Sequence, residues 1–196
     1  MRVVGGRFRG RELKAPRGLR TRPTAGRVRE AVFSLLGDLE GERVLDLFAG
    51  SGALGIEALS RGAGEVVFVE RDPQAVAALA SNLARLGIGK DQGRILRADA
   101  LAALRKARNR GWKYDLVLID PPYAEGWRWE QPLRELLPAV LAGDGRAVVE
   151  CDRQAPLTLG RDPVTERRYG NTLIRIYLRE DMTEMKESRH GKEGEG

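Results

Sequence analysis

The sequence predicts an α/β fold, a doubly wound and mostly parallel sheet of seven strands with an antiparallel hairpin at its C-terminal end. Three observations predict this fold. From residue 43 onward, short apolar segments alternate with segments of helical apolar spacing. A glycine-rich loop, residues 50–55, follows the first apolar segment. The segment 114–119 ends in an unbroken apolar run, which is typical of a strand buried on both faces of a parallel sheet.

The predicted elements are short and have recognisable end signals. Thr24 is a candidate N-cap of a first helix, whose exposed side is expected to carry Arg29. Asp72 can cap a later helix that Gly87 ends. Further helices are predicted over residues 53–61, 100–108 and 131–141. The predicted strands are residues 43–48, 65–70, 94–97, 114–119, 146–150, 164–169 and 173–178, and a Gly170-Asn171 turn joins the last two.

Basic residues are concentrated at the N-terminus. The chain has 196 residues and a net charge of +6, yet residues 1–29 hold nine arginines and one lysine against one glutamate, a net +9. Such a segment favours contact with nucleic-acid phosphates. We predict a small basic arm or hairpin over residues 1–23, a compact domain over 24–179 and a disordered polar tail over 180–196. The arginines expected to bind RNA are Arg7, Arg9, Arg11, Arg20, Arg22 and Arg29.

Composition excludes several classes of protein. The mean hydropathy is −0.38 and no apolar run approaches the length of a membrane span, so a cytoplasmic protein without membrane contact is expected. The single cysteine, Cys151, excludes an internal disulfide, and the single histidine, His190, lies in a polar segment. We therefore expect no metal site and no histidine-dependent catalysis, and we expect a monomer.

The loop Gly50-Ser51-Gly52-Ala53-Leu54-Gly55 has the spacing G-x-G-x-x-G between a strand and a helix. Its backbone can bend sharply and approach a ligand at the helix N-terminus. Glu70 ends the next strand, where an acidic side chain can receive two ribose hydroxyls. These two features fit a dinucleotide and S-adenosylmethionine equally well.

Two aspartates favour S-adenosylmethionine. Asp46 lies in the first strand, where its carboxylate could hold the methionine amino group directly or through water. Asp99 follows the third strand and could accept a hydrogen bond from the adenine amino group, a role compatible with capping the next helix. The expected fold is thus the Rossmann-like fold of the S-adenosylmethionine-dependent methyltransferases, with 24–179 as the catalytic domain. The residues expected to contact the cofactor are Asp46, Ala49, Gly50, Ser51, Gly52, Glu70, Arg71, Asp99 and Ala100.

The motif Asp120-Pro121-Pro122-Tyr123 follows the fourth strand, which is expected to lie beside the first. An exocyclic amine of a base is a poor nucleophile because its lone pair is conjugated into the ring. If the Asp120 carboxylate and the Pro121 carbonyl accept its two N–H groups, the lone pair can point at a methyl donor. Pro121 and Pro122 keep the loop rigid, and Tyr123 can stack on the base. A simple surface turn is the alternative interpretation.

Five segments of the chain together carry a family resemblance, namely residues 5–11, 22–33, 46–62, 120–123 and 169–172. Through them the sequence resembles the bacterial 16S rRNA guanine-N2 methyltransferases, the RsmD-type small-subunit rRNA methyltransferases. The resemblance implies guanine as the target base and 16S rRNA, within a small-subunit ribosomal particle, as the substrate. This chain has Gly26 and Ser34 where members of the family often have aspartate and asparagine.

Three other functions remain open from the residues alone. An amino methyltransferase acting on adenine N6 or cytosine N4 could use the same motif. A non-catalytic RNA-binding module is disfavoured by the intact Asp46, Glu70 and Asp120. An NAD-dependent oxidoreductase would share the glycine loop but lacks an evident set of residues for hydride chemistry.

Overall fold

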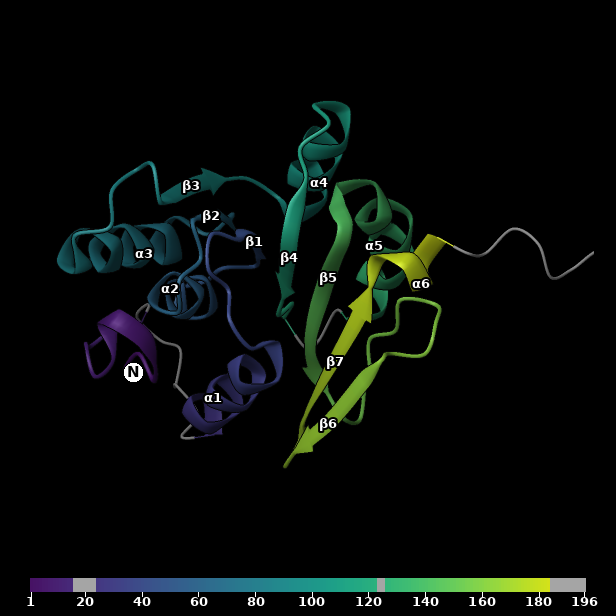
Figure 1. The fold of residues 1–196 in the computed structure, drawn as a ribbon, viewed down its shortest axis with the longest axis horizontal. Helices are drawn as coiled ribbons and strands as arrows, with labels where there is room; N and C mark the ends of the chain where they lie inside the picture. Colours follow the sequence, from purple (N-terminus) through teal and green to yellow (C-terminus); the bar gives the residue numbers. More distant parts are fainter. Residues whose placement is uncertain (16–23, 123–125, 184–196) are drawn as a thin grey trace, which may run out of the picture.

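The computed structural model describes residues 1–15, 24–122 and 126–183, and its centre is a seven-stranded sheet (Figure 1). The strand order is β3-β2-β1-β4-β5-β7-β6, with β1 to β5 parallel and β7 antiparallel to both its neighbours. The predicted seven-stranded α/β fold with its C-terminal hairpin is therefore confirmed. The strands are β1 Arg43–Leu47, β2 Glu65–Glu70, β3 Gly93–Arg97, β4 Tyr114–Ile119, β5 Leu141–Asp152, β6 Thr165–Tyr169 and β7 Thr172–Leu178.

Helices cover both faces of the sheet, because each right-handed crossover returns the chain over one face or the other. One core contains residues of α4, α5 and α6, and the other contains residues of α1, α2 and α3 together with the N-terminal segment. The helices are α1 Thr24–Leu36, α2 Ala53–Ser60, α3 Pro73–Leu86, α4 Ala100–Asn109, α5 Gly126–Val140 and α6 Arg179–Thr183, and a short 3₁₀ helix η1 spans Gly6–Phe8.

The order of the strands reverses between β1 and β4. Leu47 of β1 pairs with Ile119 of β4, so both strands end at the same level of the sheet. Ligands of such sheets bind beyond the carboxyl ends of the strands at this reversal. The glycine loop and Asp120 therefore leave the sheet side by side.

Three boundaries differ from the sequence prediction by three residues or more. Helix α5 begins at Gly126 because the apolar spacing of Leu133 and Leu137 continues back to Trp129, and Pro132 lies inside the helix. Strand β5 begins at Leu141, which pairs with Tyr114 across a register shift. The polar tail begins later than residue 180, because Arg179–Thr183 form α6.

The N-terminal segment packs against the core instead of standing apart from it. Val3 and Leu13 are buried, and Arg2 and Glu12 face each other in an antiparallel bridge. Gly6 has a φ of +68°, and a Cβ there would lie 1.7 Å from the carbonyl oxygen of Ser60, so only glycine fits this close approach. Residues 1–15 are thus part of the compact fold.

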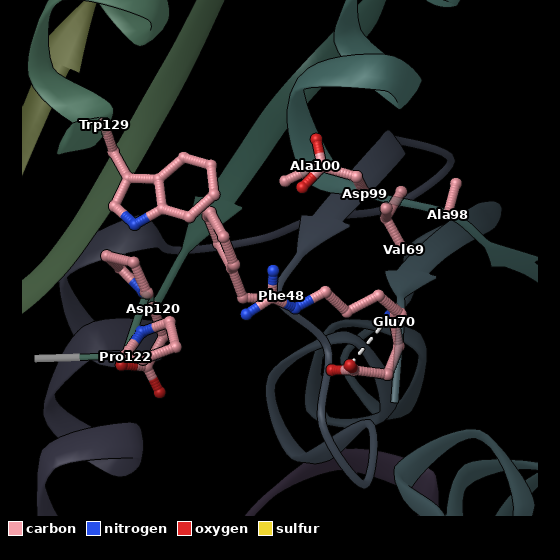
Figure 2. Close-up of a pocket in the computed structure, with 11 residues that line it drawn as sticks. Phe48, Val69, Glu70, Ala98, Asp99, Ala100, Asp120, Pro122 and Trp129 are labelled. Atoms are coloured by element: carbon pink, nitrogen blue, oxygen red, sulfur yellow. Dashed lines mark hydrogen bonds between the residues drawn. The ribbon is translucent and has the colours of Figure 1, made fainter. Parts of the chain in front are cut away.

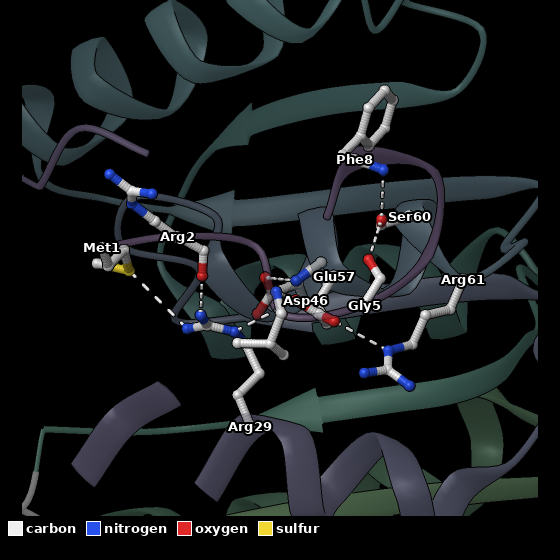
Figure 3. A network of polar contacts seen from close by, with 11 residues as sticks. Met1, Arg2, Gly5, Phe8, Arg29, Asp46, Glu57, Ser60 and Arg61 are labelled. Carbon is white, nitrogen blue, oxygen red and sulfur yellow. Dashed lines mark hydrogen bonds and ion pairs between the residues drawn. The ribbon is translucent and has the colours of Figure 1, made fainter. Parts of the chain in front are cut away.

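Buried polar side chains of α2 hold this segment in place (Figure 3). The Glu57 carboxylate is fully buried and accepts a hydrogen bond from Val4 N at 2.9 Å. Arg29 and Arg61 both form ion pairs with it, at 3.4 Å and 2.9 Å. A buried carboxylate needs such partners, since an unpaired charge would be very costly in the interior.

Arg29 is therefore not an exposed RNA-binding residue, and that prediction is wrong. Its side chain is only 4% exposed and donates to the carbonyl of Arg2. Burial lowers the pKa of the guanidinium, while Glu57 opposes that shift. Arg29 follows the buried Val28 on α1 and faces the N-terminal segment, which packs over its aliphatic part. The spacing of residues along α1 does not reveal this contact.

Candidate cofactor and catalytic site

A cavity of about 330 Å³ opens at the carboxyl ends of β1, β2 and β4 (Figure 2). Its volume lies in the range of roughly 300–1,000 Å³ that is typical of small-molecule sites. The cavity brings together seven of the predicted site residues from three separate loops. The lining residues are Phe48, Val69, Glu70, Arg71, Ala98, Asp99, Ala100, Asp120, Pro121, Pro122 and Trp129.

Glu70 is the acidic residue at the end of β2. Its Oε2 accepts a hydrogen bond from Gly50 N at 2.8 Å, and its Oε1 accepts from the backbone N–H groups of Arg71 and Asp72 at 2.7 Å and 2.8 Å. These bonds fix the carboxylate between the glycine loop and the start of α3. Oε1 thus already uses both of its lone pairs, whereas Oε2 keeps one, so Glu70 can still accept a hydrogen bond from a ligand hydroxyl through Oε2.

Asp99 caps α4 at the rim of the same cavity. Its Oδ1 accepts from Leu101 N at 2.9 Å and from Ala102 N at 3.3 Å, so the expected N-cap is confirmed. Among the described residues, Oδ2 receives no hydrogen bond that would compete with a ligand. An amino group entering between Ala98 and Ala100 would meet this acceptor.

The glycine loop packs closely on α3 and on β2. A Cβ on Gly52 would lie 2.3 Å from Leu79 Cδ1, and one on Gly55 would lie 2.4 Å from Phe68 Cε1. Gly52 also has a φ of +84° where α2 begins. The glycines therefore let the N-terminus of α2 approach β1 and β2 at the edge of the cavity.

Asp46 lies under the loop and not on the cavity surface. It is 1% exposed, and its Oδ2 accepts from Gly55 N at 2.9 Å. Burial raises the pKa of this carboxyl to about 7, against the opposing effect of the Gly55 hydrogen bond, and Glu70 adds to the increase. Asp46 thus holds the helix that follows the loop. The other predicted cofactor residues that do not line the cavity are Ala49, Gly50, Ser51 and Gly52.

Two aromatic residues that the sequence did not indicate form a wall of the cavity. The rings of Phe48 and Trp129 meet edge to face, with centroids 4.8 Å apart and planes at 72° (Figure 2). Phe48 has a φ of +67° and is the one non-glycine residue with a positive φ in the described part of the chain. Such strain is concentrated at functional sites. The position of Phe48 directly before the glycine loop was the signal that could have identified it.

Trp129 is 6% exposed, and its Nε1 has no hydrogen-bond partner among the described residues. An indole N–H buried in this way is normally paired. Its helical spacing to Leu133 indicates only a core position, so the pattern of residues does not identify Trp129 as a site residue. Tyr123, Arg20 and Arg22 lie outside the described residues.

Asp120 follows the last residue of β4 and faces the cavity opposite Glu70 and Asp99 (Figure 2). The cavity therefore has acidic acceptors on opposite sides, and the apolar Val69 and Ala98 lie on the side of Glu70 and Asp99 (Figure 2). No group of three or more residues suited to holding a metal ion occurs within the described ranges. Nor does any described helix have the length and apolar character to cross a membrane.

The fold and this site define the class of the protein. In the dinucleotide-binding fold the sheet order is 3-2-1-4-5-6, whereas here the antiparallel β7 separates β5 from β6. Glu70 and Asp99 offer acceptors for a ribose and an amino group, and the apolar residues between them fit the faces of a purine. The protein is an S-adenosylmethionine-dependent methyltransferase.

The chain belongs to the family described as "Conserved hypothetical protein 95", whose model matches residues 1–178. It is 42% identical over 186 residues to the Bacillus subtilis (strain 168) protein named "Putative rRNA methyltransferase YlbH", covering 90% of this chain and 98% of that one. It is 39% identical over 127 residues to the Escherichia coli (strain K12) "Ribosomal RNA small subunit methyltransferase D", covering 64% and 62% of the two chains. The structure "Putative methyltransferase yhhF from Escherichia coli" matches with a TM-score of 0.75 and 34% identity, covering 91% and 97%. The resemblance to the RsmD-type methyltransferases is thereby confirmed.

Proposed function

We propose that this protein methylates the exocyclic N2 of a guanine in 16S rRNA of the small ribosomal subunit. The observation that carries the proposal is the position of Asp120 and Pro121 in the same cavity as Glu70 and Asp99. The name of the E. coli relative, a small-subunit rRNA methyltransferase, supports the choice of RNA. The choice of guanine N2 rests on the resemblance to the RsmD-type enzymes.

Glu70 and Asp99 would hold the cofactor by its adenosine part. Glu70 would accept a hydrogen bond from a ribose hydroxyl through Oε2, and Asp99 Oδ2 would accept one from the adenine amino group. Asp46 would act indirectly, because it accepts a hydrogen bond from Gly55 N and so holds the start of α2 in place. This role replaces the predicted contact with the methionine amino group of the cofactor. S-adenosylmethionine supplies a methyl group on a positively charged sulfur, which makes that carbon electrophilic.

Asp120 and Pro121 would position the nucleophile. The carboxylate of Asp120 and the carbonyl of Pro121 accept the two N–H groups of the guanine amine, which leaves the lone pair directed out of the base. As the new N–C bond forms and the S–C bond breaks, positive charge develops on the nitrogen. The same two acceptors stabilise this charge, and the proton then leaves to solvent. Asp120 is a hydrogen-bond acceptor in this mechanism and not a strong base.

The aromatic wall would protect the reaction from water. Phe48 and Trp129 cover one side of the cavity between Asp120 and Asp99 (Figure 2). Excluding water strengthens the hydrogen bonds from the amine to Asp120, because their electrostatic part grows as the local dielectric constant falls.

The exposed arginines of the N-terminal segment would contact the RNA backbone. Arg7, Arg9 and Arg11 are all exposed, which distinguishes them from Arg29. The base must leave its stack to reach a cavity of this kind, and phosphate contacts can hold the flanking strands while it does so. We further propose that the enzyme acts as a monomer on a small-subunit particle in the cytoplasm.

Mapping of modified nucleotides tests this function. Purified enzyme and S-adenosylmethionine would be incubated with naked 16S rRNA and with small-subunit particles that lack the mark. We expect N2-methylguanosine at one position, found by mass spectrometry of nuclease fragments. N6-methyladenosine or N4-methylcytidine instead would contradict the choice of base, and an absence of methylation on both substrates would contradict the choice of RNA.

A further inference from the structure

A second group of cations lies at the edge of the sheet formed by β3. It consists of Arg94 on β3 and of Arg105, Lys106, Arg108 and Arg110 at the end of α4, and we call it the edge cluster. All five residues are exposed. Between residues 93 and 113 the chain has seven basic residues and one acidic residue, Asp99. This concentration of charge equals the net charge of the whole chain, +6.

The two segments that form the edge cluster, β3 and the end of α4, meet at Trp112. The guanidinium of Arg94 lies 5.5 Å from the centroid of the indole ring, and the ammonium of Lys106 lies 5.9 Å from it. The ring itself is half-buried and packs on the core beneath α4 and α5. Trp112 therefore holds cations from β3 and α4 beside each other by cation–π contacts.

The edge cluster continues into the basic N-terminal segment on the other face of the sheet. Arg7 donates to Gln92 Oε1 at 3.3 Å, and Gln92 is two residues from Arg94. Arg11 donates to the carbonyl of Arg85 at 3.2 Å, at the end of α3. Basic side chains thus follow the β3 edge from one face of the sheet to the other.

The edge cluster lacks the acidic partners that several arginines elsewhere in this protein have. Arg43 pairs with Glu65, Arg146 with Glu42 and Arg175 with Glu166. In contrast, none of the five cluster residues forms an ion pair with any carboxylate in the ranges that the structure describes. Like charges held together without counter-charges repel one another, so an anionic partner would stabilise them.

We propose that the edge cluster binds phosphates of the substrate RNA at a distance from the methylated base. The inference rests on the proposed function, because it takes RNA as the polyanion. Helix α4 connects the two places, since its N-terminus at Asp99 borders the cavity and its C-terminus carries the edge cluster. Ten helical residues span about 15 Å at 1.5 Å per residue. The phosphates contacted are therefore those of nucleotides outside the one that enters the cavity.

The double variant Arg105→Gln/Arg108→Gln tests this inference. Neither side chain has a structural contact in the described part of the chain, so the fold should not change. The matched control is Arg134→Gln/Arg167→Gln. This control removes two exposed arginines near the opposite edge of the sheet, one beside Gly160 and one on β6.

Binding of a 16S rRNA fragment would be measured by fluorescence anisotropy over a series of salt concentrations. Each phosphate contact changes log K by about 0.7–0.9 per tenfold change in salt. The loss of two contacts should therefore weaken binding roughly 25- to 60-fold at about 0.1 M salt and lower the salt slope by about 1.4–1.8, while the affinity of the edge variant for S-adenosylmethionine is unchanged. The control should bind as the wild type does.

Two results separate this inference from the proposed function. Wild-type affinity and salt slope in the edge variant, or an equal loss in the control, would overturn the inference even if the enzyme methylates guanine. A loss confined to the edge variant would support it even if mapping shows another base or no methylation, and then only the proposed function fails.

Discussion

Asn82 donates its side-chain amide to the carbonyl oxygen of Ser51 at 3.0 Å, which joins α3 to the glycine loop. The same side chain accepts from Lys14 N at 2.8 Å and donates to Lys14 O at 3.0 Å. Asn82 is fully buried. One side chain therefore satisfies backbone groups of both the cofactor loop and the basic N-terminal segment.

Replacement of Asn82 by alanine should destabilise both regions together. The change leaves the buried carbonyl oxygen of Ser51 without this partner, at a cost of about 1–3 kcal/mol, and it also removes the two part-buried hydrogen bonds to the backbone of Lys14. We expect a loss of at least ~2 kcal/mol in the free energy of unfolding and a weaker affinity for S-adenosylmethionine. Urea unfolding and calorimetry measure the two effects. Asn109→Ala, at an exposed position at the end of α4, is the control and should change neither.

Gly6→Ala should be far more damaging than Gly10→Ala. Both glycines have a positive φ, +68° and +81°, but a Cβ on Gly6 would collide with the Ser60 carbonyl, whereas a Cβ on Gly10 meets nothing within 4 Å. We expect a loss of about 1–2 kcal/mol for Gly10→Ala from backbone strain alone, and roughly 3 kcal/mol or more for Gly6→Ala. Equal melting temperatures of the two variants would show that the N-terminal segment is not held against α2.

Asp120→Ala should remove methyl transfer and leave cofactor binding almost intact. The carboxylate acts on the amine of the base, while Glu70 and Asp99 are placed for the adenosine part. The rate of transfer should fall by roughly 10²-fold or more, as for loss of a group that stabilises transition-state charge. Asp120→Asn keeps an acceptor oxygen and should be intermediate. An equal loss of cofactor affinity and rate would refute the positioning role.

Asp46 should make stability depend on pH. Its pKa is raised by burial to about 7 in the folded protein, against about 3.9 in an unfolded chain. The folded state therefore binds the proton of the Asp46 carboxyl more tightly than the unfolded state does. The contribution of this protonation to the free energy of unfolding is complete below about pH 4 and is lost as the pH rises through 7. Asp46→Asn keeps an oxygen for Gly55 N without titrating. The stability of the wild type relative to this variant should fall between about pH 4 and pH 7 in urea titrations, and a constant difference would contradict the prediction.

Trp129→Phe should preserve stability, whereas Trp129→Ala should not. The indole N–H has no partner among the described residues, so its removal sacrifices no hydrogen bond within them. Truncation to alanine removes a buried ring that meets Phe48, at a cost of about 3–5 kcal/mol. Thermal unfolding distinguishes the variants. A large loss in the phenylalanine variant would show that the N–H is bonded in the folded protein.

The sequence predicted the sheet and its helices well because the residues that begin and end each element lie close together in the chain. Caps such as Asp72 and Asp99, the stop at Gly87 and the apolar strands each depend on a few neighbouring residues. Glu70, Asp99 and Asp120 could be placed at one site from topology alone, since parallel strands end at a common edge.

The remaining features depend on contacts between segments far apart in the chain. Nothing near Arg29 in the sequence reveals that it faces Glu57, and nothing near Asn82 indicates Lys14. Trp129 has the helical spacing of a core residue, and only the packing of α5 against Phe48 makes it part of a cavity. The sequence places Asp46 near the cofactor, but its burial beneath the glycine loop is a property of the folded chain and has no local signal.

The anchoring of the N-terminal segment also determines when it can fold during protein synthesis. Its hydrogen bonds to Glu57, Ser60 and Asn82 join residues 53, 52 and 68 positions apart. A nascent chain that ends before α3 lacks the last of these partners, and contacts of such long separation form slowly. Residues 1–15 can thus reach all of these contacts only after α3 has been synthesised, and until then Val3 and Leu13 lack part of the core that covers them.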